Sequence, residues 1–542
     1  MMITALKSAT FIGIDAVPVD VEVFISNGIP GIMIVGLPDA STKEAKDRVK
    51  AAIKNSGFEY PVKKITINLA PADLRKEGPI FDLPLAIGIL ISAGRLACAV
   101  NLDDYIIAGE LSLNGKINRI NGIIALCRLA GKLNKKLIIP YDNINSACYI
   151  GIDFLAFRRL KDVCGFISSG YAKDSERNGA IYVHDVKNIF KDKEGNEEFF
   201  FRKYIAEADN ALKKTKIDYP DFSDIKGQEL TKRAILIAVC GRHNILMVGP
   251  PGSGKTMLAQ SIAGIQPDIL LEESIETSNI YSFSNKKIGG ESGLIGKRPF
   301  IPVHHTVSTA GLIGGGALNP APGDISLAHN GVLFIDEFSE LSRKTLDSLR
   351  QPMEDKTVNL SRSRFSIILP CDFMLVAAMN PCPCGYYGDK NHECRCSGAE
   401  IYKFYAKLSG PILDRFDIFI GVYSSNLDEL TEGRVIENSS EVQKTVERVR
   451  QIQLERYKGK DCGGIKFNAS LRSSDADKYL LISPPALELV KNAVKKLNIS
   501  SRGYFRILRV SRTIADMDGK KEVDAGSVLE ALNYRNTKLL NV

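Results

Sequence analysis

Hydrophobic and polar positions alternate in the first third of the chain, and the pattern predicts strands interleaved with helices. Residues 19–25 alternate as a half-buried strand, and residues 65–69 form a second short apolar run. Residues 41–56 place apolar side chains at helical spacing, whereas the continuous apolar stretch at 83–91 predicts a buried helix. We therefore expect residues 1–168 to form one α/β domain.

The pattern changes twice further along the chain. Residues 169–221 are crowded with Lys and Glu and have poor periodicity, which predicts a linker. In residues 222–425 apolar strands are again followed by helices, which predicts a second α/β domain. Residues 426–542 are expected to form a helical lid domain, with helices at 440–457, 484–497, 504–517 and 524–534.

A phosphate-binding motif follows the apolar strand at 244–248. The motif reads Gly249, Pro250, Pro251, Gly252, Ser253, Gly254, Lys255, Thr256, and a helix continues from Met257. In this strand–loop–helix context, glycines let backbone N–H groups turn toward phosphate oxygens, and the helix N-terminus favours negative charge. We expect residues 249–257 to bind ATP, with Lys255 on the β- and γ-phosphates and Thr256 on Mg²⁺.

Two later apolar strands end in polar residues that suit ATP hydrolysis. Residues 332–335 run into Asp336 and Glu337. Asp336 is expected to hold Mg²⁺ through water, and Glu337 to polarise the attacking water. Residues 374–378 lead to Asn380, which we expect to orient that water, although an Asn after a strand is by itself more often a turn residue.

Two arginines are candidates for charge stabilisation. Arg415 lies near a helix end, and in a ring it would reach the γ-phosphate of the neighbouring subunit. The alternative is an ordinary ion pair with Asp414 or Asp417. Arg502 opens a basic helix and is expected to contact nucleotide, the alternative being a solvated basic face.

The chain has eleven cysteines, and their distribution is uneven. Seven are scattered, which is typical of reduced thiols in a cytosolic protein. The other four are Cys382, Cys384, Cys394 and Cys396, and together they could bind Zn²⁺, with His392 as a substitute ligand. Their C-x-C spacing is tighter than the usual C-x₂-C, so four free thiols remain the alternative.

Composition narrows the class of protein only slightly. Hydrophobic residues make up 44% and charged residues 25% of the 542 residues, as in ordinary globular proteins. The net charge of +8 permits nucleic-acid binding without requiring it. No apolar run reaches the ~18 residues of a membrane span, and no signal peptide is recognisable. We expect a cytoplasmic protein without a membrane partner.

Three longer stretches, residues 299–308, 323–337 and 349–355, resemble the magnesium-chelatase-like AAA+ group. The chain as a whole resembles the ComM/YifB proteins, and the match covers residues 1–168 and 222–542. This resemblance implies a homo-hexameric ATPase that moves on single-stranded or branched DNA, as a helicase that promotes branch migration during DNA uptake.

The resemblance also places two insertions in the second α/β domain. One is the Gly- and Pro-rich segment of about 279–330, and the other is a β-hairpin at 358–369. In relatives such hairpins line the pore of the ring, so Arg362 and Arg364 would contact DNA phosphates. A solvated turn is the alternative.

The N-terminal domain resembles the C-terminal fold of Lon proteases. The nucleophilic serine of that family would align with Ile80 and its catalytic lysine with Ile124. Isoleucine can neither attack a carbonyl nor accept a proton, so we expect no proteolysis. A protein-remodelling ATPase, in which this domain binds a protein partner, is one alternative function. A metal-chelatase motor is another, although that motor subunit lacks such a domain.

Overall fold

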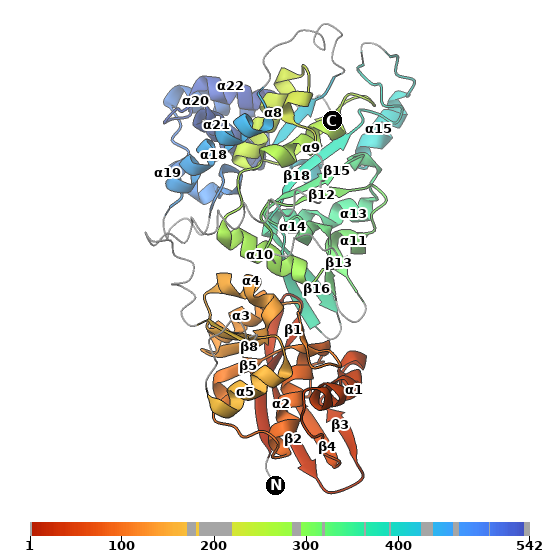
Figure 1. Cartoon of the computed structure of the whole chain (residues 1–542). Helices are drawn as coiled ribbons and strands as arrows, with labels where there is room; N and C mark the ends of the chain where they lie inside the picture. The colour runs from red at the N-terminus through yellow and green to blue at the C-terminus, as the bar shows by residue number, and fades with distance from the viewer. Residues whose placement is uncertain are drawn as a thin grey trace. The chain divides into compact units, whose positions relative to one another are not determined.

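The computed structural model describes residues 3–170, 180–183, 219–284, 294–316, 320–362, 365–389, 392–423, 437–458, 465–497 and 499–535. The chain divides into two compact units (Figure 1). The first comprises Met1–Thr215 and Leu271–Gly296, and the second comprises Lys216–Leu270 and Lys297–Val542. No helix in the described ranges is long and apolar enough to cross a membrane.

The first unit is built on an eight-stranded mixed sheet with the order β10-β9-β8-β5-β1-β2-β4-β3. Its strands are β1 (Thr4–Ile12), β2 (Asp15–Ser26), β3 (Gly31–Val35), β4 (Lys64–Ala70), β5 (Tyr105–Ile107), β8 (Lys136–Pro140), β9 (Phe154–Phe157) and β10 (Ala180–Val183). Its helices include α1 (Ala40–Asn55), α2 (Asp82–Ser92), α3 (Ile123–Lys132), α4 (Ile144–Ala147) and α5 (Leu160–Ser169). A small hairpin joins β6 (Glu110–Leu111) to β7 (Ile117–Asn118).

The periodicity of the sequence predicted the elements of this unit well. The alternating stretch at 19–25 lies inside β2, and the amphipathic stretch at 41–56 forms α1. The uniformly apolar stretch at 83–91 forms α2, which is buried along almost its whole length. Within the expected linker, β10 pairs antiparallel with β9. The rest of the linker, 171–179 and 184–218, lies outside the described residues.

Two positions in the first unit are expected to correspond to the catalytic dyad of a protease. Ile80 lies in the short helical turn before α2, and Ile124 lies in the first turn of α3. Both side chains are buried in the hydrophobic core of the unit. Neither side chain is therefore placed to meet a substrate, and the Lon-like nature of the domain stays a prediction.

A segment from the middle of the chain completes the first unit. Helix α10 (Leu271–Ser282) lies within the range expected for the ATPase core, yet it packs on the core of this unit through Leu271 and Ile275. The amide of Asn279 donates a hydrogen bond to the carbonyl of Ile14 (3.0 Å). The rings of Phe11 and Phe283 meet edge to face, with centroids 5.2 Å apart. The N-terminal residues thus share their core with a distant part of the chain.

The second unit is built on a five-stranded parallel sheet with the order β12-β15-β18-β11-β19. Its strands are β11 (Ile245–Val248), β12 (Phe300–Val303), β15 (Val332–Ile335), β18 (Met374–Met379) and β19 (Ile418–Gly421). Their nearly continuous apolar sequences suit a parallel sheet that is covered on both faces. Helices α8 (Glu229–Gly241) and α9 (Lys255–Ile265) contribute to the same hydrophobic core.

Shorter elements surround this sheet. They are α11 (Thr309–Ile313), α12 (Asp324–Leu327), α13 (Arg343–Ser348), α14 (Arg350–Asp355), α15 (Gly398–Ala406) and α16 (Gly410–Leu413), with the small pair β13 (Gly314–Gly315) and β14 (Ala321–Pro322). The predicted hairpin is present as β16 (Thr357–Arg362) and β17 (Phe365–Pro370). The side chain of Arg362 and all of Arg364 lie outside what the structure describes, so their expected contacts with DNA stay a prediction.

The C-terminal part of the second unit is helical, as predicted. Its helices are α18 (Ser439–Arg456), α19 (Ala476–Tyr479), α20 (Pro484–Leu497), α21 (Ser501–Met517) and α22 (Ala525–Asn533). Val446 and Ile507 pack into the core around the parallel sheet. A second cluster, which includes Leu480, Val490 and Val523, joins the helices to one another.

Candidate nucleotide site

The phosphate-binding loop lies between β11 and α9, at the carboxyl end of the parallel sheet. Gly252 (φ +76°) and Gly254 (φ +85°) adopt left-handed conformations that disfavour other residues. Gly249 is required for another reason, because a Cβ there would lie 2.1 Å from the carbonyl oxygen of Val422. The loop backbone can therefore curl into an anion cradle ahead of the helix N-terminus.

Lys255 is the first residue of α9 and points back into the loop. Its ammonium donates to the carbonyls of Gly249 and Pro250 (both 2.8 Å) and to the Oδ1 of Asn380 (3.3 Å). Burial lowers the pKa of Lys255, and the nearby Asp336 partly offsets this effect. A buried cation whose acceptors are neutral carbonyl groups suits a phosphate, so these residues fit ATP.

The candidate magnesium ligands meet directly. The hydroxyl of Thr256 donates to the Oδ2 of Asp336 (2.7 Å). Asp336 follows the last residue of β15, and its Oδ1 accepts from the backbone N–H of Glu337 (2.9 Å). A hydroxyl and a carboxylate are the hard oxygen donors that Mg²⁺ prefers, so this pair also fits the ion.

Glu337, the candidate catalytic carboxylate, pairs with a histidine that the sequence reasoning did not single out. The Nδ1 of His305 contacts the Oε2 of Glu337. His305 lies just after β12, which neighbours β15 in the sheet, so the topology brings the two side chains together. Glu337 has a left-handed backbone (φ +50°) that directs this turn. The signal available in the sequence was the polar pair His304–His305 directly after an apolar strand.

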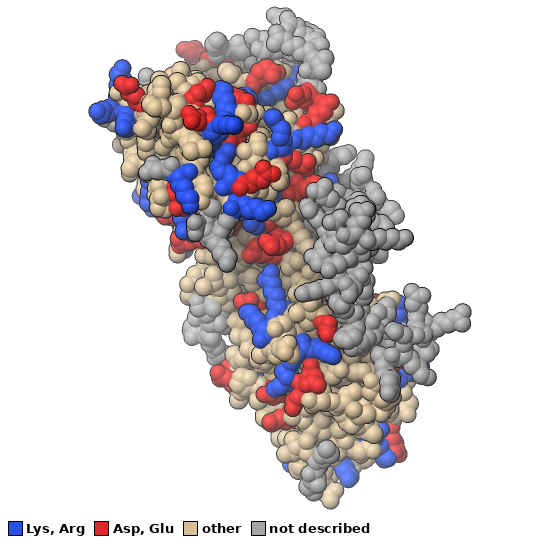
Figure 2. All heavy atoms as spheres, turned by 90° about the vertical axis from the view of Figure 1, so that its left-hand side faces the viewer, with Lys and Arg blue, Asp and Glu red and all other residues tan. Residues whose placement is uncertain are grey.

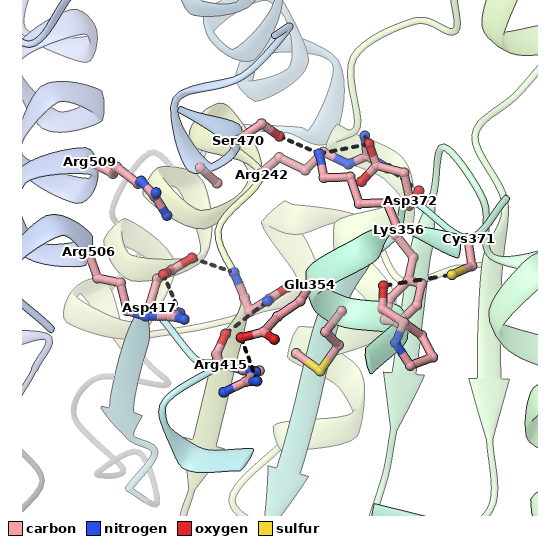
Figure 3. Close-up of a pocket in the computed structure, with 15 residues that line it drawn as sticks. Arg242, Glu354, Lys356, Cys371, Asp372, Arg415, Asp417, Ser470, Arg506 and Arg509 are labelled. Atoms are coloured by element: carbon pink, nitrogen blue, oxygen red, sulfur yellow. Dashed lines mark hydrogen bonds and ion pairs between the residues drawn. The ribbon is translucent and has the colours of Figure 1, made fainter. Parts of the chain in front are cut away.

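The two candidate arginines lie together in a different place, beside Glu354 of α14, and Figure 3 shows the Arg415–Glu354 pair. The Oε1 of Glu354 is 2.5 Å from the Nη2 of Arg415 and 3.5 Å from the Nη2 of Arg502. Arg415 also donates to the carbonyl of Pro411 (2.9 Å), while its buried Nε has no hydrogen-bond partner among the described residues. Burial lowers the pKa of Arg415, and the Glu354 carboxylate counteracts this effect.

Arg415 and Glu354 line a cavity of about 110 Å³ that is rich in cations (Figure 3). Its charged lining comprises Arg242, Glu354, Lys356, Asp372, Arg415, Asp417, Arg506 and Arg509. Asp417, the alternative partner considered for Arg415, is instead bound by Arg506 (2.8 Å) and lies 3.4 Å from His243. Burial would raise the pKa of Asp417, but Arg506 and His243 hold it below its ordinary value.

The candidate residues thus form two separate sets. The phosphate set comprises Lys255, Thr256, Asp336, Glu337 and Asn380, and the arginine set comprises Arg415 and Arg502 with Glu354 between them. Within the described residues, no hydrogen bond or ion pair joins the two sets. The sequence predicted the other members of both sets but not Glu354, although Glu354 lies within residues 349–355, one of the stretches that resemble the magnesium-chelatase-like group.

The four clustered cysteines converge on one point. The Sγ atoms of Cys382, Cys384 and Cys394 lie 3.3–3.7 Å apart, and the backbone N–H of Cys384 donates to the Sγ of Cys396 (3.4 Å). All four sulfur atoms lie within 4.8 Å of one another, so the cluster could hold a metal ion. His392 contacts Asp389 rather than this cluster.

The charged residues on the surface shown in Figure 2 do not indicate a particular binding partner. On the face shown in Figure 2, basic and acidic side chains are interspersed rather than gathered into one large patch of a single sign. The net charge of +8 is therefore no argument for a particular partner on this face.

Comparison with known proteins shows which families the chain resembles. Residues 221–430 match the family described as magnesium chelatase, subunit ChlI. Residues 21–143 match subunit ChlI of Mg-chelatase, and residues 436–535 match its C-terminal family. The chain is 40% identical to competence protein ComM of Haemophilus influenzae over 537 residues, which cover 99% of this chain and 98% of that protein.

The chain belongs to the ComM/YifB family. It is also 38% identical to the uncharacterized protein YifB of Escherichia coli over 537 residues, or 99% of this chain and 97% of that protein. A more distant likeness links it to the DNA replication licensing factor MCM6 of Arabidopsis thaliana, at 22% identity over 503 residues, 86% of this chain and 54% of that protein. These similarities support the role of an AAA+ motor.

Proposed function

We propose that this chain is a magnesium-dependent ATPase whose active sites are completed between subunits of a homo-hexameric ring. The observation that carries the proposal is the separation of the two sets of residues. The phosphate set holds a lysine, a hydroxyl and two carboxylates around the loop, but it contains no arginine. Because Arg415 is engaged elsewhere in the same chain, a second copy has to supply an arginine to each phosphate set.

The residues of the phosphate set then have distinct tasks. Mg²⁺ held by these residues would supply positive charge that offsets the charge of the phosphates. Lys255 and the loop backbone bind the phosphates, while Thr256 and Asp336 hold the ion. Glu337 accepts a hydrogen bond from the attacking water, which Asn380 orients. In the free chain the contact with His305 keeps Glu337 occupied, so this contact has to open before catalysis.

We further propose that the ring moves on single-stranded or branched DNA as a helicase that promotes branch migration. The similarity to a competence protein and to a DNA replication licensing factor supports DNA as the partner. The β16–β17 hairpin, which follows α14, is the element proposed to reach the DNA through Arg362 and Arg364. The N-terminal domain, proposed to be Lon-like and non-proteolytic, would bind a protein partner.

The test of this function is whether DNA accelerates ATP turnover. Purified protein should hydrolyse ATP faster with forked or single-stranded DNA than without DNA, and electron microscopy with ATP should show six-membered rings. An Arg362→Ala/Arg364→Ala variant should keep its basal turnover and lose the stimulation. Turnover stimulated by a protein extract but unchanged by any DNA would favour a protein-remodelling ATPase.

We propose Zn²⁺ as the metal of the four-cysteine cluster. Thiolate sulfur is a preferred ligand of this ion, and four sulfur atoms around one point suit its tetrahedral coordination. Elemental analysis of protein purified without chelator should find one zinc per chain.

A further inference from the structure

The four-cysteine loop lies directly against the phosphate-binding loop. Gly385 follows Cys384 and has a left-handed backbone (φ +88°). A Cβ on Gly385 would lie 2.7 Å from the Cδ and 2.8 Å from the Cγ of Pro251, and 3.9 Å from the Cγ of Asn380. Pro251 lies in the motif that cradles phosphate. The backbone at Gly385 therefore packs so closely on the pyrrolidine ring that a side chain at this position would clash with it.

The start of the cysteine loop is fixed to the nucleotide site by hydrogen bonds. The backbone N–H of Gly249 donates to the carbonyl of Met379 (3.2 Å), at the end of β18. On the other side, the hydroxyl of Tyr405 on α15 donates to the carbonyl of Pro381 (2.7 Å), and this bond is buried. Residues 379–381 are thus held between the phosphate loop and α15.

The turn that carries Gly385 depends on the cysteines themselves. The N–H of Gly385 donates to the carbonyl of Cys382 (3.0 Å), and the N–H of Tyr387 donates to the Sγ of Cys382 (3.3 Å). The Sγ atoms of Cys382 and Cys384, on the two sides of Pro383, lie 3.3 Å apart. Whatever binds these two sulfur atoms sets the position of the next residue, which is Gly385.

We propose that the metal held by the four cysteines is a structural part of the nucleotide site, because it presses Gly385 against Pro251 and so fixes the phosphate-binding loop. This inference rests on the proposed ATP and zinc sites. Four metal–sulfur bonds remove the freedom of the turn at 382–385, and release of the metal lets Gly385 withdraw from Pro251. Metal and nucleotide then strengthen each other's binding by the same factor.

Two neighbouring glycines offer a matched test. Gly385 and Gly388 both have positive φ (+88° and +75°), but a Cβ on Gly388 would meet nothing within 4 Å. Gly385→Ala and Gly388→Ala therefore share the backbone strain, and only the first pushes on Pro251. Both variants keep the four cysteines, so their zinc content should equal that of the wild type by elemental analysis.

Nucleotide affinity is the decisive measurement, with a fluorescent ADP analogue as the probe. We expect the Gly385→Ala protein to bind it about tenfold more weakly than the Gly388→Ala protein, since overpacking at a rigid contact is costly. A Gly385→Ala/Pro251→Ala double variant should regain affinity relative to Gly385→Ala, because alanine lacks the Cγ and Cδ atoms of the ring. Equal affinities of the two single variants would overturn the proposed contact.

Zinc removal tests the same link without any substitution. Wild-type protein stripped by a chelator should bind the ADP analogue more weakly and recover when Zn²⁺ is returned, and saturating ADP should slow zinc release to a colorimetric chelator. Unchanged ADP affinity after stripping overturns the proposal. Wild-type protein that binds ADP but contains no zinc overturns the metal site and this inference but leaves the proposed ATPase standing, whereas protein that binds zinc but no nucleotide overturns the proposed ATPase.

Discussion

At the scale of single residues, the two candidate arginines and Glu337 each have a partner within the same chain. Glu354 pairs with Arg415 and Arg502, and His305 pairs with Glu337. The Glu354 carboxylate offsets part of the cost of burying the Arg415 guanidinium. In the proposed ring, the neighbouring subunit and the bound nucleotide would displace these partners, which would link assembly to catalysis at individual side chains.

Lys255 and Glu337 are expected to fail in different ways when replaced. Lys255→Ala removes the buried ammonium, and nucleotide binding should be lost while the protein stays folded. Glu337→Gln keeps the phosphate contacts and should bind ATP, stall as a stable ring and lose turnover by about 10²-fold or more. Binding of a fluorescent ATP analogue, turnover and ring formation by light scattering separate the two cases. Normal turnover in Glu337→Gln would remove that residue from the mechanism.

Asp372 should make the second unit sensitive to acid. Burial would raise the pKa of Asp372, but the cations Arg242 and Lys356 hold it at about 2. Because the pKa is lower in the folded than in the unfolded state, the carboxylate stabilises the fold above about pH 5, and this contribution of about 2 kcal/mol disappears as the pH falls toward 2. The difference in unfolding free energy between wild type and Asp372→Asn, measured by urea titration, should shrink over that range. A constant difference would contradict the assignment.

At the scale of elements, the candidate site lies in the connections between strands and helices, and the chain passes from the second unit to the first between α9 and α10. Helix α9 ends at Ile265, and α10, which begins only at Leu271, already belongs to the first unit. Arg298, on the returning segment, donates to the carbonyls of Pro267 (2.8 Å) and Asp268 (3.1 Å). Hydrogen bonds therefore join the two chain segments, residues 267–268 and Arg298, at the point where the chain leaves the second unit and returns to it.

The first unit should lose stability when the packing of the segment Leu271–Gly296 is weakened. Leu294 is 1% exposed and belongs to the core of that unit. Leu294→Ala should cost roughly 2–5 kcal/mol, as other buried truncations do, and calorimetry should show an earlier transition for the first unit alone. Leu529→Ala is the control, since Leu529 lies in α22 and is 53% exposed. Equal melting of the two variants would mean that the segment adds little to that core.

The helices and turns that would carry a protease dyad carry two isoleucines instead. Ile80 and Ile124 are both buried, so neither offers a nucleophile or a base to a peptide. We expect no cleavage of casein with or without ATP, measured by release of labelled peptides. ATP-dependent cleavage that Lys255→Ala abolishes would contradict this prediction.

At the scale of the whole molecule, one chain holds both sets of candidate residues, but within the described residues no hydrogen bond or ion pair joins the phosphate set to the arginine set. Each set instead has partners of its own, such as Glu354 for Arg415 and Arg502 and the loop carbonyls for Lys255. A closed ring of identical subunits would join every phosphate set to the next subunit's arginine set. The quantity that matters for activity is therefore assembly, and it can be tested by mixing.

Arg415 should act on the nucleotide of its neighbour. Arg415→Ala is expected to keep its affinity for ATP and to lose about 10³-fold or more of its turnover. Mixed with the equally inactive Lys255→Ala protein, it should recover part of the rate, because some interfaces then pair an intact loop with an intact arginine. Native mass measurement confirms that mixed rings form. Mixed hexamers without recovered activity would argue against action between subunits.

What the sequence alone determined lies in contiguous stretches. The phosphate motif, the acidic pair after β15 and the clustered cysteines are each defined by neighbours along the chain, so periodicity and spacing were sufficient to identify them. The apolar strands of the parallel sheet were also predictable, because burial on both faces requires a continuous run of apolar residues.

Only the tertiary structure decided which distant residues meet. It placed α10 with the N-terminal residues, Glu354 between Arg415 and Arg502, His305 on Glu337, and Gly385 on Pro251. No local pattern predicts these pairs, because each joins positions brought together by strand order and loop path rather than by spacing. The physical reason is that short-range periodicity reports which face of an element is buried, whereas packing alone selects the partner that buries it.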